Sequence, residues 1–412
     1  MRCGVDFGTS NSAVALSTGE VLKVEASGRL SRSVLFFPED TGEVLAGGPA
    51  IERYLEDNAG RFIQSMKTWL PSSTFTRTQI RNRTLLLEDL IAVFLKSLRT
   101  SAMETLGKDL DEVVMGRPAR FSTDPVADAF AQERLKKAAE LAGFTQVSFL
   151  IEPIAAALAY EATLKRDELV LVADFGAGTS DLTLMWLGPT RRVKTERRGD
   201  VVASSGVYVG GDRFDAAIMK HKLLPYFGQG TTYEVGFKRM PIPTYVLSRL
   251  LSWNEMSLIR EKSTRELIDQ MMKTSTNKDA IAALHDLVMY NLGYRLYRAI
   301  EQAKVELSTK KKATVVFSDE RVHIEEQVTR AEFDTFCKPL IDELEVCTDE
   351  LLARAPKDLR IDSVFLTGGS SQIPAVRALF ARKFGEDRLR TADAFTSVVE
   401  GLGRAADLAF KL

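Results

Sequence analysis

Two stretches of the chain repeat one pattern: residues 3–16 read CGVDFGTSNSAVAL, and residues 171–185 read LVADFGAGTSDLTLM. Each contains an apolar strand that ends in an aspartate, a turn of small residues, and a second apolar strand. Asp6 and Asp174 are 174 − 6 = 168 residues apart, and Gly8 and Gly176 share that spacing. The repeat predicts two related lobes whose hairpins hold one phosphate chain.

The turn after each aspartate has the composition of an anion-binding loop. Gly8 lacks a Cβ, so backbone N–H groups can approach an anion closely. Three side chains of the same turn add donors: Thr9, Ser10 and Asn11. The second turn repeats this composition with Gly176, Ala177, Gly178 and Thr179. One such stretch is typical of an ordinary β-hairpin, but two with the same flanking strands favour a phosphate site.

Composition excludes several classes of protein. The 412 residues predict two or three domains, and 45% apolar with 27% charged residues is ordinary for a soluble chain. The net charge is −1, from 55 basic and 56 acidic residues, which does not favour nucleic acid or an anionic membrane as partner. Three scattered cysteines, three histidines without metal-ligand spacing and no export signal fit a reducing cytoplasm.

Strand-like and helix-like segments alternate along the chain, which predicts an α/β architecture. Apolar residues at helical spacing predict a helix from Leu86 to Leu106, and residues 128–144 have the pattern of an amphipathic helix. Residues 35–84 are less regular and predict a small insert, while residues 225–300 read as mostly helical. The Ala-rich helix after Glu152 has small side chains that permit close packing, and the last helix is also rich in small residues.

Two further glycine pairs suit close approach of a ribose or a phosphate. Gly210 and Gly211 precede a predicted helix, and Gly368 and Gly369 follow a predicted strand, with Ser370 next in the chain. Each pair alone is also compatible with an ordinary turn. The order of all four glycine-containing motifs along the chain is stronger evidence for a nucleotide site than any one of them.

In combination, these motifs resemble the nucleotide-binding domain of the seventy-kilodalton heat-shock (DnaK-type) chaperones, within the actin-like ATPase superfamily. The resemblance extends over nearly the whole chain and is weakest in residues 35–84 and 222–290. The motifs that carry it are DFGTSNS (6–12), FLIEPIAAALAYE (149–161), ADFGAGTSDLTL (173–184), VGGDRFD (209–215), EQAKVELS (301–308) and FLTGGSSQIPAV (365–376).

The resemblance implies a two-lobed actin-like ATPase fold of duplicated ribonuclease-H-like domains, each with an inserted subdomain. Lobe I would comprise residues 1–167 and 393–412 with an insert at about 35–84, and lobe II residues 168–392 with an insert at about 213–330. The implied cofactors are ATP or ADP and Mg²⁺, with slow ATP hydrolysis in the cytoplasm. Unfolded protein clients or a co-chaperone would be the partners, rather than nucleic acid or a membrane.

The same resemblance assigns roles on the phosphate side. Asp6 and Asp174 would face Mg²⁺, mostly through water, since magnesium uses few carboxylates. Lys67, in SMKTWL (65–70), would reach the γ-phosphate, and Glu152 or Asp174 would orient the attacking water. Thr9 and Thr179 would donate to phosphate oxygens.

On the nucleoside side, Glu301, Lys304 and Ser308 lie on one face of a predicted helix, spaced i, i+3 and i+7. A solvated stripe is the alternative to contact with ribose and adenine. The other residues that we predict to bind nucleotide are Gly210, Gly211, Gly368, Gly369, Ser370, Gln372 and Asp393.

The chain departs from the family pattern in two respects. Val305 and Gln372 stand where the family places the two arginines that sandwich adenine. Each lost cation–π stack would cost roughly 0.5–2 kcal/mol, which predicts weaker binding and looser base choice. The family also continues into a peptide-binding domain, whereas nothing follows residue 412 here, so we expect a stand-alone member that lacks that domain.

Other classes remain open at this level. An actin-like filament shares the phosphate loops, although the residues around Glu152 and Gly368 look more like a chaperone. A small-molecule kinase would need a dedicated catalytic aspartate in the first lobe, for which we find no motif. A nucleotide sensor with little turnover is compatible with the altered adenine contacts, but the full set of phosphate-side residues favours an ATPase.

Overall fold

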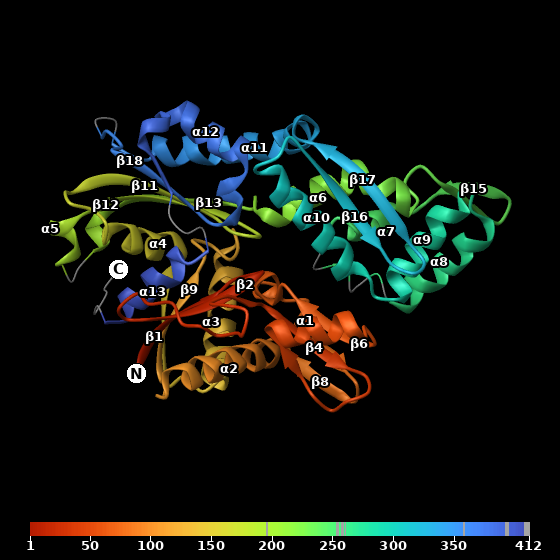
Figure 1. The fold of residues 1–412 in the computed structure, drawn as a ribbon, viewed down its shortest axis with the longest axis horizontal. Coiled ribbons are helices and arrows are strands. Elements are labelled where there is room, and N and C mark those ends of the chain that lie inside the picture. Colours follow the sequence, from red (N-terminus) through yellow and green to blue (C-terminus); the bar gives the residue numbers. More distant parts are fainter. Residues whose placement is uncertain are drawn as a thin grey trace. The chain divides into compact units, whose positions relative to one another are not determined.

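The computed structural model describes residues 1–194, 197–252, 255–256, 259, 261–356, 359–391 and 395–407. Two compact units make up the chain (Figure 1). The first unit comprises Met1–Gly210, Glu343–Gln372 and Val376–Leu412, and the second comprises Gly211–Asp342 with Ile373–Ala375. The α/β architecture is confirmed, while the lobe boundaries expected from the sequence are still a prediction.

Both large sheets of the first unit use one scheme. The first has the order β10 (Gln146–Ile151), β9 (Glu112–Arg117), β1 (Arg2–Phe7), β2 (Asn11–Leu16) and β3 (Ser31–Arg32). The second has the order β13 (Val201–Val207), β12 (Ser180–Leu187), β11 (Glu168–Phe175), β18 (Ser363–Thr367) and β19 (Leu389–Thr391). In each, the first strand of the hairpin pairs antiparallel with the next strand and parallel with a later one, β9 or β18. The repeated sequence pattern is therefore a repeated fold.

Two helices of small residues lie between these sheets, α4 (Glu152–Glu161) and α13 (Ser397–Asp407) (Figure 1). A Cβ on Gly401 would stand 1.7 Å from the carbonyl oxygen of Ala155, so no side chain fits where α13 crosses α4. A Cβ on Gly403 would stand 2.2 Å from the carbonyl oxygen of Leu16 in β2. The close packing predicted from the small side chains is confirmed.

The helices over the N-terminal sheet form where local signals predict them. In α2 (Leu87–Leu106) the apolar stripe is buried, Asp89 accepts from the Leu86 N–H at 2.9 Å, and Gly107 ends the helix at φ +64°. In α3 (Pro125–Leu141), Asp124 accepts from the Val126 N–H at 3.1 Å. Proline suits the first position of a helix, which explains why α3 begins three residues before the predicted start.

The remaining elements of the first unit are short. The segment predicted as an insert contains the sheet β5–β4–β6 and the hairpin β7–β8. The bounds are β4 (Val34–Pro38), β5 (Leu45–Ala46), α1 (Gly47–Glu56), β6 (Gly60–Gln64), a 3₁₀ turn (Met66–Trp69), β7 (Arg77–Ile80), β8 (Arg83–Leu86), α5 (Pro189–Arg192) and 3₁₀ turns at Arg198–Asp200, Gly369–Gln372 and Glu386–Arg388. Residues of both units make up α11 (Arg330–Ala353) and α12 (Pro374–Phe384).

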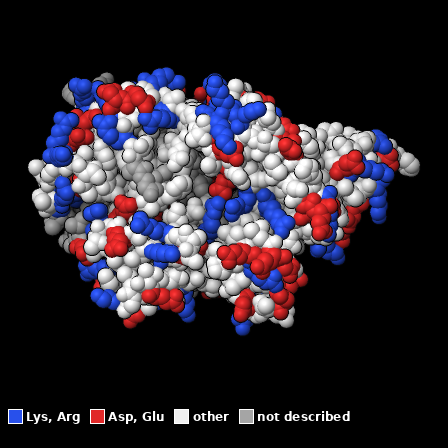
Figure 2. All heavy atoms as spheres, viewed as in Figure 1, with Lys and Arg blue, Asp and Glu red and all other residues white. Residues whose placement is uncertain are grey.

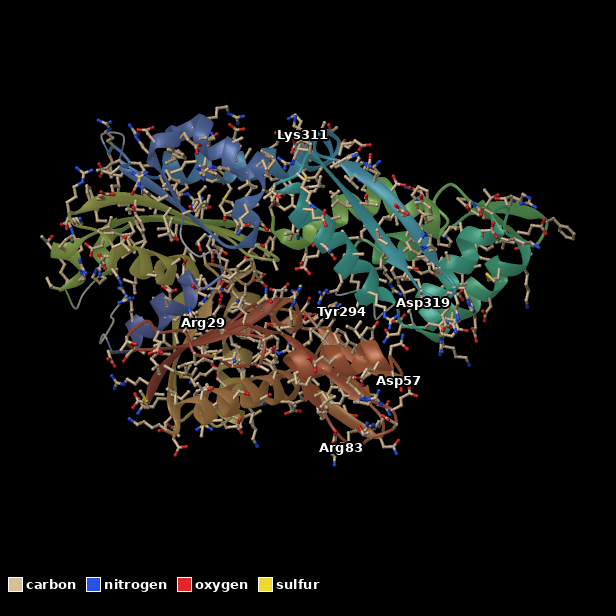
Figure 3. All side chains as sticks on the ribbon, in the orientation of Figure 1. Arg29, Asp57, Arg83, Tyr294, Lys311 and Asp319 are labelled. Carbon is tan, nitrogen blue, oxygen red and sulfur yellow. The ribbon has the colours of Figure 1, made fainter. Side chains whose placement is uncertain are left out.

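The second unit is mainly helical but contains two hairpins. Its elements are α6 (Gly211–Ile218), a π turn (Met219–Leu223), a 3₁₀ turn (Leu224–Phe227), β14 (Thr232–Val235), β15 (Lys238–Pro241), α7 (Thr244–Arg249), α8 (Lys262–Thr274), α9 (Lys278–Met289), α10 (Gly293–Leu307), β16 (Lys312–Ser318) and β17 (His323–Thr329). Asp319, at the turn between β16 and β17, accepts from Arg295 at 3.2 Å (Figure 3). The prediction of a mostly helical segment over 225–300 missed the hairpin β14–β15, whose two-residue turn depends on Gly236 at φ +62°.

Surface charge is mixed, as the composition suggests. Basic and acidic side chains are interspersed on the face shown in Figure 2. Among the described residues, no helix combines the length and the hydropathy that crossing a lipid bilayer demands.

Candidate functional site

The two hairpin turns lie opposite each other within the first unit. Residues 8–11 connect β1 to β2, and residues 176–179 connect β11 to β12. The Oγ1 atom of Thr9 lies 3.9 Å from the point where a Cβ on Gly178 would stand. The fold therefore brings together two stretches that are 168 residues apart in the sequence.

The turn backbones are tightly closed. A Cβ on Gly8 would stand 2.1 Å from the carbonyl oxygen of Asn11, and the Gly176 N–H donates to the carbonyl oxygen of Thr179 at 2.9 Å. The residues of both turns, including Ser10 and Ala177, are half-buried. Small residues are required here because the chain folds back on itself.

Lys67 and Glu152 form a largely buried ion pair beside these turns. Lys67 lies on the 3₁₀ turn Met66–Trp69, and its Nζ donates to Oε1 of Glu152 at 2.5 Å. Glu152 is the first residue of α4, where the partial positive charge of a helix N-terminus favours a carboxylate. Burial alone would lower the pKa of Lys67, but the negative charges of Glu152 and Asp6 outweigh it and raise the pKa. Lys67 is therefore held in its charged form.

The charges of Lys67 and Glu152 affect the pKa values of three nearby aspartates, Asp6, Asp174 and Asp181. Burial raises the pKa of Asp6 to about 7, the charge of Glu152 adds to the rise, and Lys67 opposes it. Burial also raises the pKa of Asp174 well above its usual range, and Glu152 is the largest charge that adds to this rise. Asp6 and Asp174 therefore both feel the charge of Glu152, and the charge of Asp6 adds to the rise in the pKa of Asp174.

Asp181 is the third of these aspartates, and the sequence analysis did not identify it as a site residue. It is 3% exposed and lies directly opposite Asp174 on the neighbouring strand. Burial raises its pKa to about 7, Glu152 adds to the rise, and hydrogen bonds from Thr179 Oγ1 at 3.0 Å and the Ala119 N–H at 3.0 Å oppose it. Two carboxylates directly opposite each other on paired strands are unfavourable for stability. Their presence on both sides of a four-residue turn therefore indicates a functional role, and this pattern could have been read from the sequence.

The acidic residues suit a hydrated cation better than an enclosed one. Among the described residues, no three His, Cys, Asp or Glu side chains are placed to hold a metal ion together. The charges of Asp181 and Asp6 nevertheless add to the rise in the pKa of Asp174, so positive charge beside these carboxylates would favour their ionised forms. Magnesium binds through few carboxylates and keeps several waters, which fits this arrangement.

Two glycine-containing turns of the first unit support the hairpins. A Cβ on Gly210 would stand 2.3 Å from the carbonyl oxygen of Ala177, so Gly210 packs directly on the second turn. Gly368, at φ +81°, packs in the same way against the carbonyl oxygen of Phe175, also at 2.3 Å. The residues that follow differ in exposure: Gly369 and Gln372 are exposed, and Ser370 is buried.

The second unit contains Gly211 and the three residues predicted on the nucleoside helix. Glu301 and Lys304 lie on α10, and Ser308 caps its C-terminal end. Lys304 Nζ donates to Oδ2 of Asp215 at 2.8 Å and to the carbonyl oxygen of Gly211, the first residue of α6, at 3.2 Å. Burial would lower the pKa of Lys304, but the charge of Asp215 raises it. This ion pair joins α10 to α6.

Two positions from the sequence analysis are not tested by this geometry. Val305, which stands where the family places a stacking arginine, is 59% exposed on α10. Asp393 lies outside the described residues.

Comparison with known proteins agrees with the arrangement of these motifs. The model of the Hsp70 protein family matches residues 2–236 and 261–407. The chaperone protein DnaK of Thermosipho africanus is 29% identical over 413 residues, covering 97% of this chain and 57% of the relative. Those of Halobacterium salinarum and Thermotoga maritima are each 28% identical and also cover 97% of this chain, with 54% and 58% of the relatives. The chain thus spans about half the length of the curated relatives it matches.

Proposed function

Because this chain belongs to the Hsp70 protein family, we propose that it binds ATP with Mg²⁺ between the two hairpin turns and hydrolyses it slowly to ADP and phosphate. One observation carries the proposal. Four acidic side chains and one buried lysine share an electrostatic centre beside two closed glycine-containing turns that face each other. Positioned charges and backbone donors of this kind are what phosphoryl transfer requires.

The metal and phosphate roles follow from the chemistry of each group. Mg²⁺, when bound, would neutralise charge on the phosphate oxygens. Asp6, Asp174 and Asp181 would hold its water shell, because ionised carboxylates at this centre need a cation. The backbone N–H groups of both turns would donate to phosphate oxygens, with the hydroxyl groups of Thr9 and Thr179 as further donors.

Lys67 and Glu152 would exchange partners on binding. In the structure, Lys67 forms an ion pair with Glu152 at 2.5 Å. A γ-phosphate would attract the Lys67 ammonium, which would free a Glu152 oxygen to accept a hydrogen bond from the attacking water. Asp174 is the second candidate for orienting that water. The need to loosen a buried ion pair supports slow turnover.

The residues that we propose to contact the nucleoside follow from the family resemblance and are taken for each unit by itself. In the first unit, Gly210, Gly368 and Gly369 would allow close approach, Ser370 and Gln372 would add polar contacts, and Asp393 is a further candidate. In the second unit, Gly211 would allow close approach, and Glu301, Lys304 and Ser308 would contact ribose and adenine. Because Val305 replaces a stacking arginine, we propose weaker affinity and looser base choice than in the family.

A chaperone-like role, with unfolded clients or a co-chaperone as partners, is part of the proposal. The relatives that match this chain carry the name chaperone protein DnaK, which supports it. We also propose a cytoplasmic location. The three cysteines are all buried free thiols, which suits a reducing compartment.

Single-turnover hydrolysis of ATP with and without Mg²⁺ tests the proposal. We expect Mg²⁺-dependent release of phosphate, and we expect Asp174→Asn to lower the rate by about 100-fold or more while ATP still binds. Titration calorimetry with ATP and GTP measures binding and base choice. Unchanged turnover in Asp174→Asn would remove Asp174 from the mechanism, and a wild-type chain that does not bind ATP would overturn the function.

The control variant is Asp40→Asn, at an exposed aspartate that pairs with Arg53 at 2.7 Å. Its turnover should equal that of the wild type, because its ion pair is on the surface. Binding without any turnover would identify a nucleotide sensor instead. Sedimentation with ATP and Mg²⁺ separates the filament alternative, since filaments pellet.

A further inference from the structure

The loop that carries Lys67 has an unusual backbone. It is entered through Ser65, a non-glycine residue at φ +53°, and the 3₁₀ turn Met66–Trp69 follows at once. A left-handed residue other than glycine persists only where its surroundings hold it in place. The conformation of this loop therefore depends on contacts made by its neighbours.

Arg134 of α3 supplies those contacts on the C-terminal side of the loop. Its Nη1 donates to three carbonyl oxygens, those of Trp69 at 3.2 Å, Leu70 at 3.1 Å and Ser72 at 3.1 Å. Its Nη2 donates to the carbonyl oxygen of Phe75 at 3.3 Å. One side chain thus binds four carbonyl groups of the segment that begins two residues after Lys67.

Arg134 is itself fixed. It is 3% exposed, its Nε donates to Oε1 of Glu88 in α2 at 3.1 Å, and its guanidinium lies 5.1 Å from the centre of the Phe130 ring. A buried charge is costly unless it is paired and hydrogen-bonded, and here each of the three guanidinium nitrogens donates to the loop or to Glu88. Only the planar five-donor fork of arginine can satisfy so many acceptors at once.

We infer that Arg134 is a positioning residue that sets the place of Lys67, and through it the reactivity of the phosphate site. The role of Lys67 at the phosphate rests on the proposed function, but the placement of Lys67 by Arg134 does not. The Leu70 N–H donates to the carbonyl oxygen of Lys67 at 3.2 Å, so the clamped segment is joined directly to the Lys67 backbone. The buried Met66 and Leu70 side chains hold the loop in the core, while Arg134 sets its path.

The first test is chemical labelling of Lys67, which requires no catalysis. Lys67 is 8% exposed, so an amine-reactive acylating reagent should modify it slowly in the wild type. In Arg134→Met we expect modification, measured by mass spectrometry, on the order of tenfold faster, because local opening becomes more frequent. Unchanged labelling of Lys67 would overturn the inference even if the protein is an active ATPase.

Arg99→Met is the matched control. Arg99 of α2 also donates to a loop carbonyl, that of Leu110 at 2.6 Å, and lies 5.4 Å from the centre of the Phe144 ring. Because it does not contact the Lys67 loop, its loss should reduce stability without accelerating the labelling of Lys67. Equal acceleration in both variants would mean that general loosening, rather than positioning, is responsible.

The second test separates positioning from folding by kinetics. In Arg134→Met we expect single-turnover hydrolysis to fall by about 10- to 100-fold, with ATP affinity changed much less. Arg134→Lys keeps the charge but has fewer donors, so its rate should lie between those of the wild type and Arg134→Met. A parallel loss of affinity and rate in Arg134→Met, with no recovery in Arg134→Lys, would contradict the inference.

A double-mutant cycle with Lys67→Met completes the design. If Arg134 acts through Lys67, the double variant should hydrolyse ATP no more slowly than Lys67→Met alone. Multiplied losses would show that the two residues act independently and would overturn the inference. If the wild type hydrolyses no ATP, the proposed function fails, whereas the labelling experiment still decides the role of Arg134.

Discussion

The two hairpins share one backbone scheme but carry their chemistry differently. Three polar side chains occupy the first turn, Thr9, Ser10 and Asn11, whereas Thr179 is the one polar side chain of the second. Position 13 in the first hairpin is the counterpart of position 181 in the second, since 181 − 13 = 168. An alanine stands at the first position and an aspartate at the second. The two hairpins thus share one fold, but most of the polar side-chain donors are on the first hairpin and the additional carboxylate is on the second.

The surroundings of positions 13 and 181 explain this difference. Ala13 is 1% exposed, packs in an apolar cluster with Val399 of α13 and lies directly opposite Asp6 on the neighbouring strand, so a carboxylate at this position would be buried beside another carboxylate. Asp181 instead accepts hydrogen bonds from the Ala119 N–H and the Thr179 hydroxyl. The comparison teaches that packing by one helix decides which hairpin can carry a second carboxylate.

The largest expected effect comes from making the first hairpin resemble the second. Ala13→Asp should lower the free energy of unfolding by about 3–5 kcal/mol or more, because it buries a carboxylate in an apolar cluster directly opposite the carboxylate of Asp6. Urea unfolding followed by circular dichroism measures this loss. Ala13→Ser, which adds a small uncharged group, should lose much less. A stable Ala13→Asp variant would mean that the cover of α13 does not exclude an acid.

Removing the charge of the second hairpin with Asp181→Asn should stabilise the chain without nucleotide, and the gain should depend on pH. The pKa of Asp181 is raised from 3.8 to about 7, so its contribution to stability is full below about pH 4 and is lost as the pH rises through about 7. Asp181→Asn remains neutral and keeps an oxygen for the Ala119 N–H. It should therefore raise the free energy of unfolding at about pH 8 by up to about 4 kcal/mol, since each pKa unit corresponds to about 1.4 kcal/mol.

Thermal unfolding of Asp181→Asn and wild type across the pH range measures this difference, which should vanish near pH 4. The same variant should bind Mg²⁺–ATP more weakly, because a ligand for the hydrated cation is lost. Asp40→Asn again serves as the control, because Asp40 is exposed. Equal stabilisation at low and high pH would show that charge is not the reason for it.

The smallest effects should distinguish the two threonines. The Thr179 hydroxyl donates to Asp181 and lowers its pKa, so Thr179→Val should shift the loss of Mg²⁺–ATP affinity on acidification to higher pH. Thr9→Val should weaken ATP binding by about 1 kcal/mol, roughly fivefold, without that shift. Calorimetric titrations at several pH values measure both. A shift of the same size in Thr9→Val would mean that the hairpins are chemically equivalent.

Local pattern in the sequence was sufficient for much of the fold. The repeated strand, aspartate and turn predicted both hairpins, helical spacing of apolar residues predicted α2, and small residues predicted close packing of α4, although not that α13 is its partner. The hairpin β14–β15 was not predicted, because its strands are short and lie among helices. Each strand has four residues, which is too short for an alternation of apolar and polar residues to stand out from the surrounding helical pattern.

The sequence by itself determined the parts of the candidate site: two acidic hairpins, a lysine, a glutamate at the start of a helix and the glycine pairs. Tertiary structure alone decided that Lys67 pairs with Glu152, that Asp181 shares the field of Asp174 and that Arg134 binds the Lys67 loop. Residues 85 positions apart meet in the first of these contacts and residues 64 apart in the last. Burial and the approach of distant charges set the pKa of each group, and neither quantity is encoded in local sequence pattern.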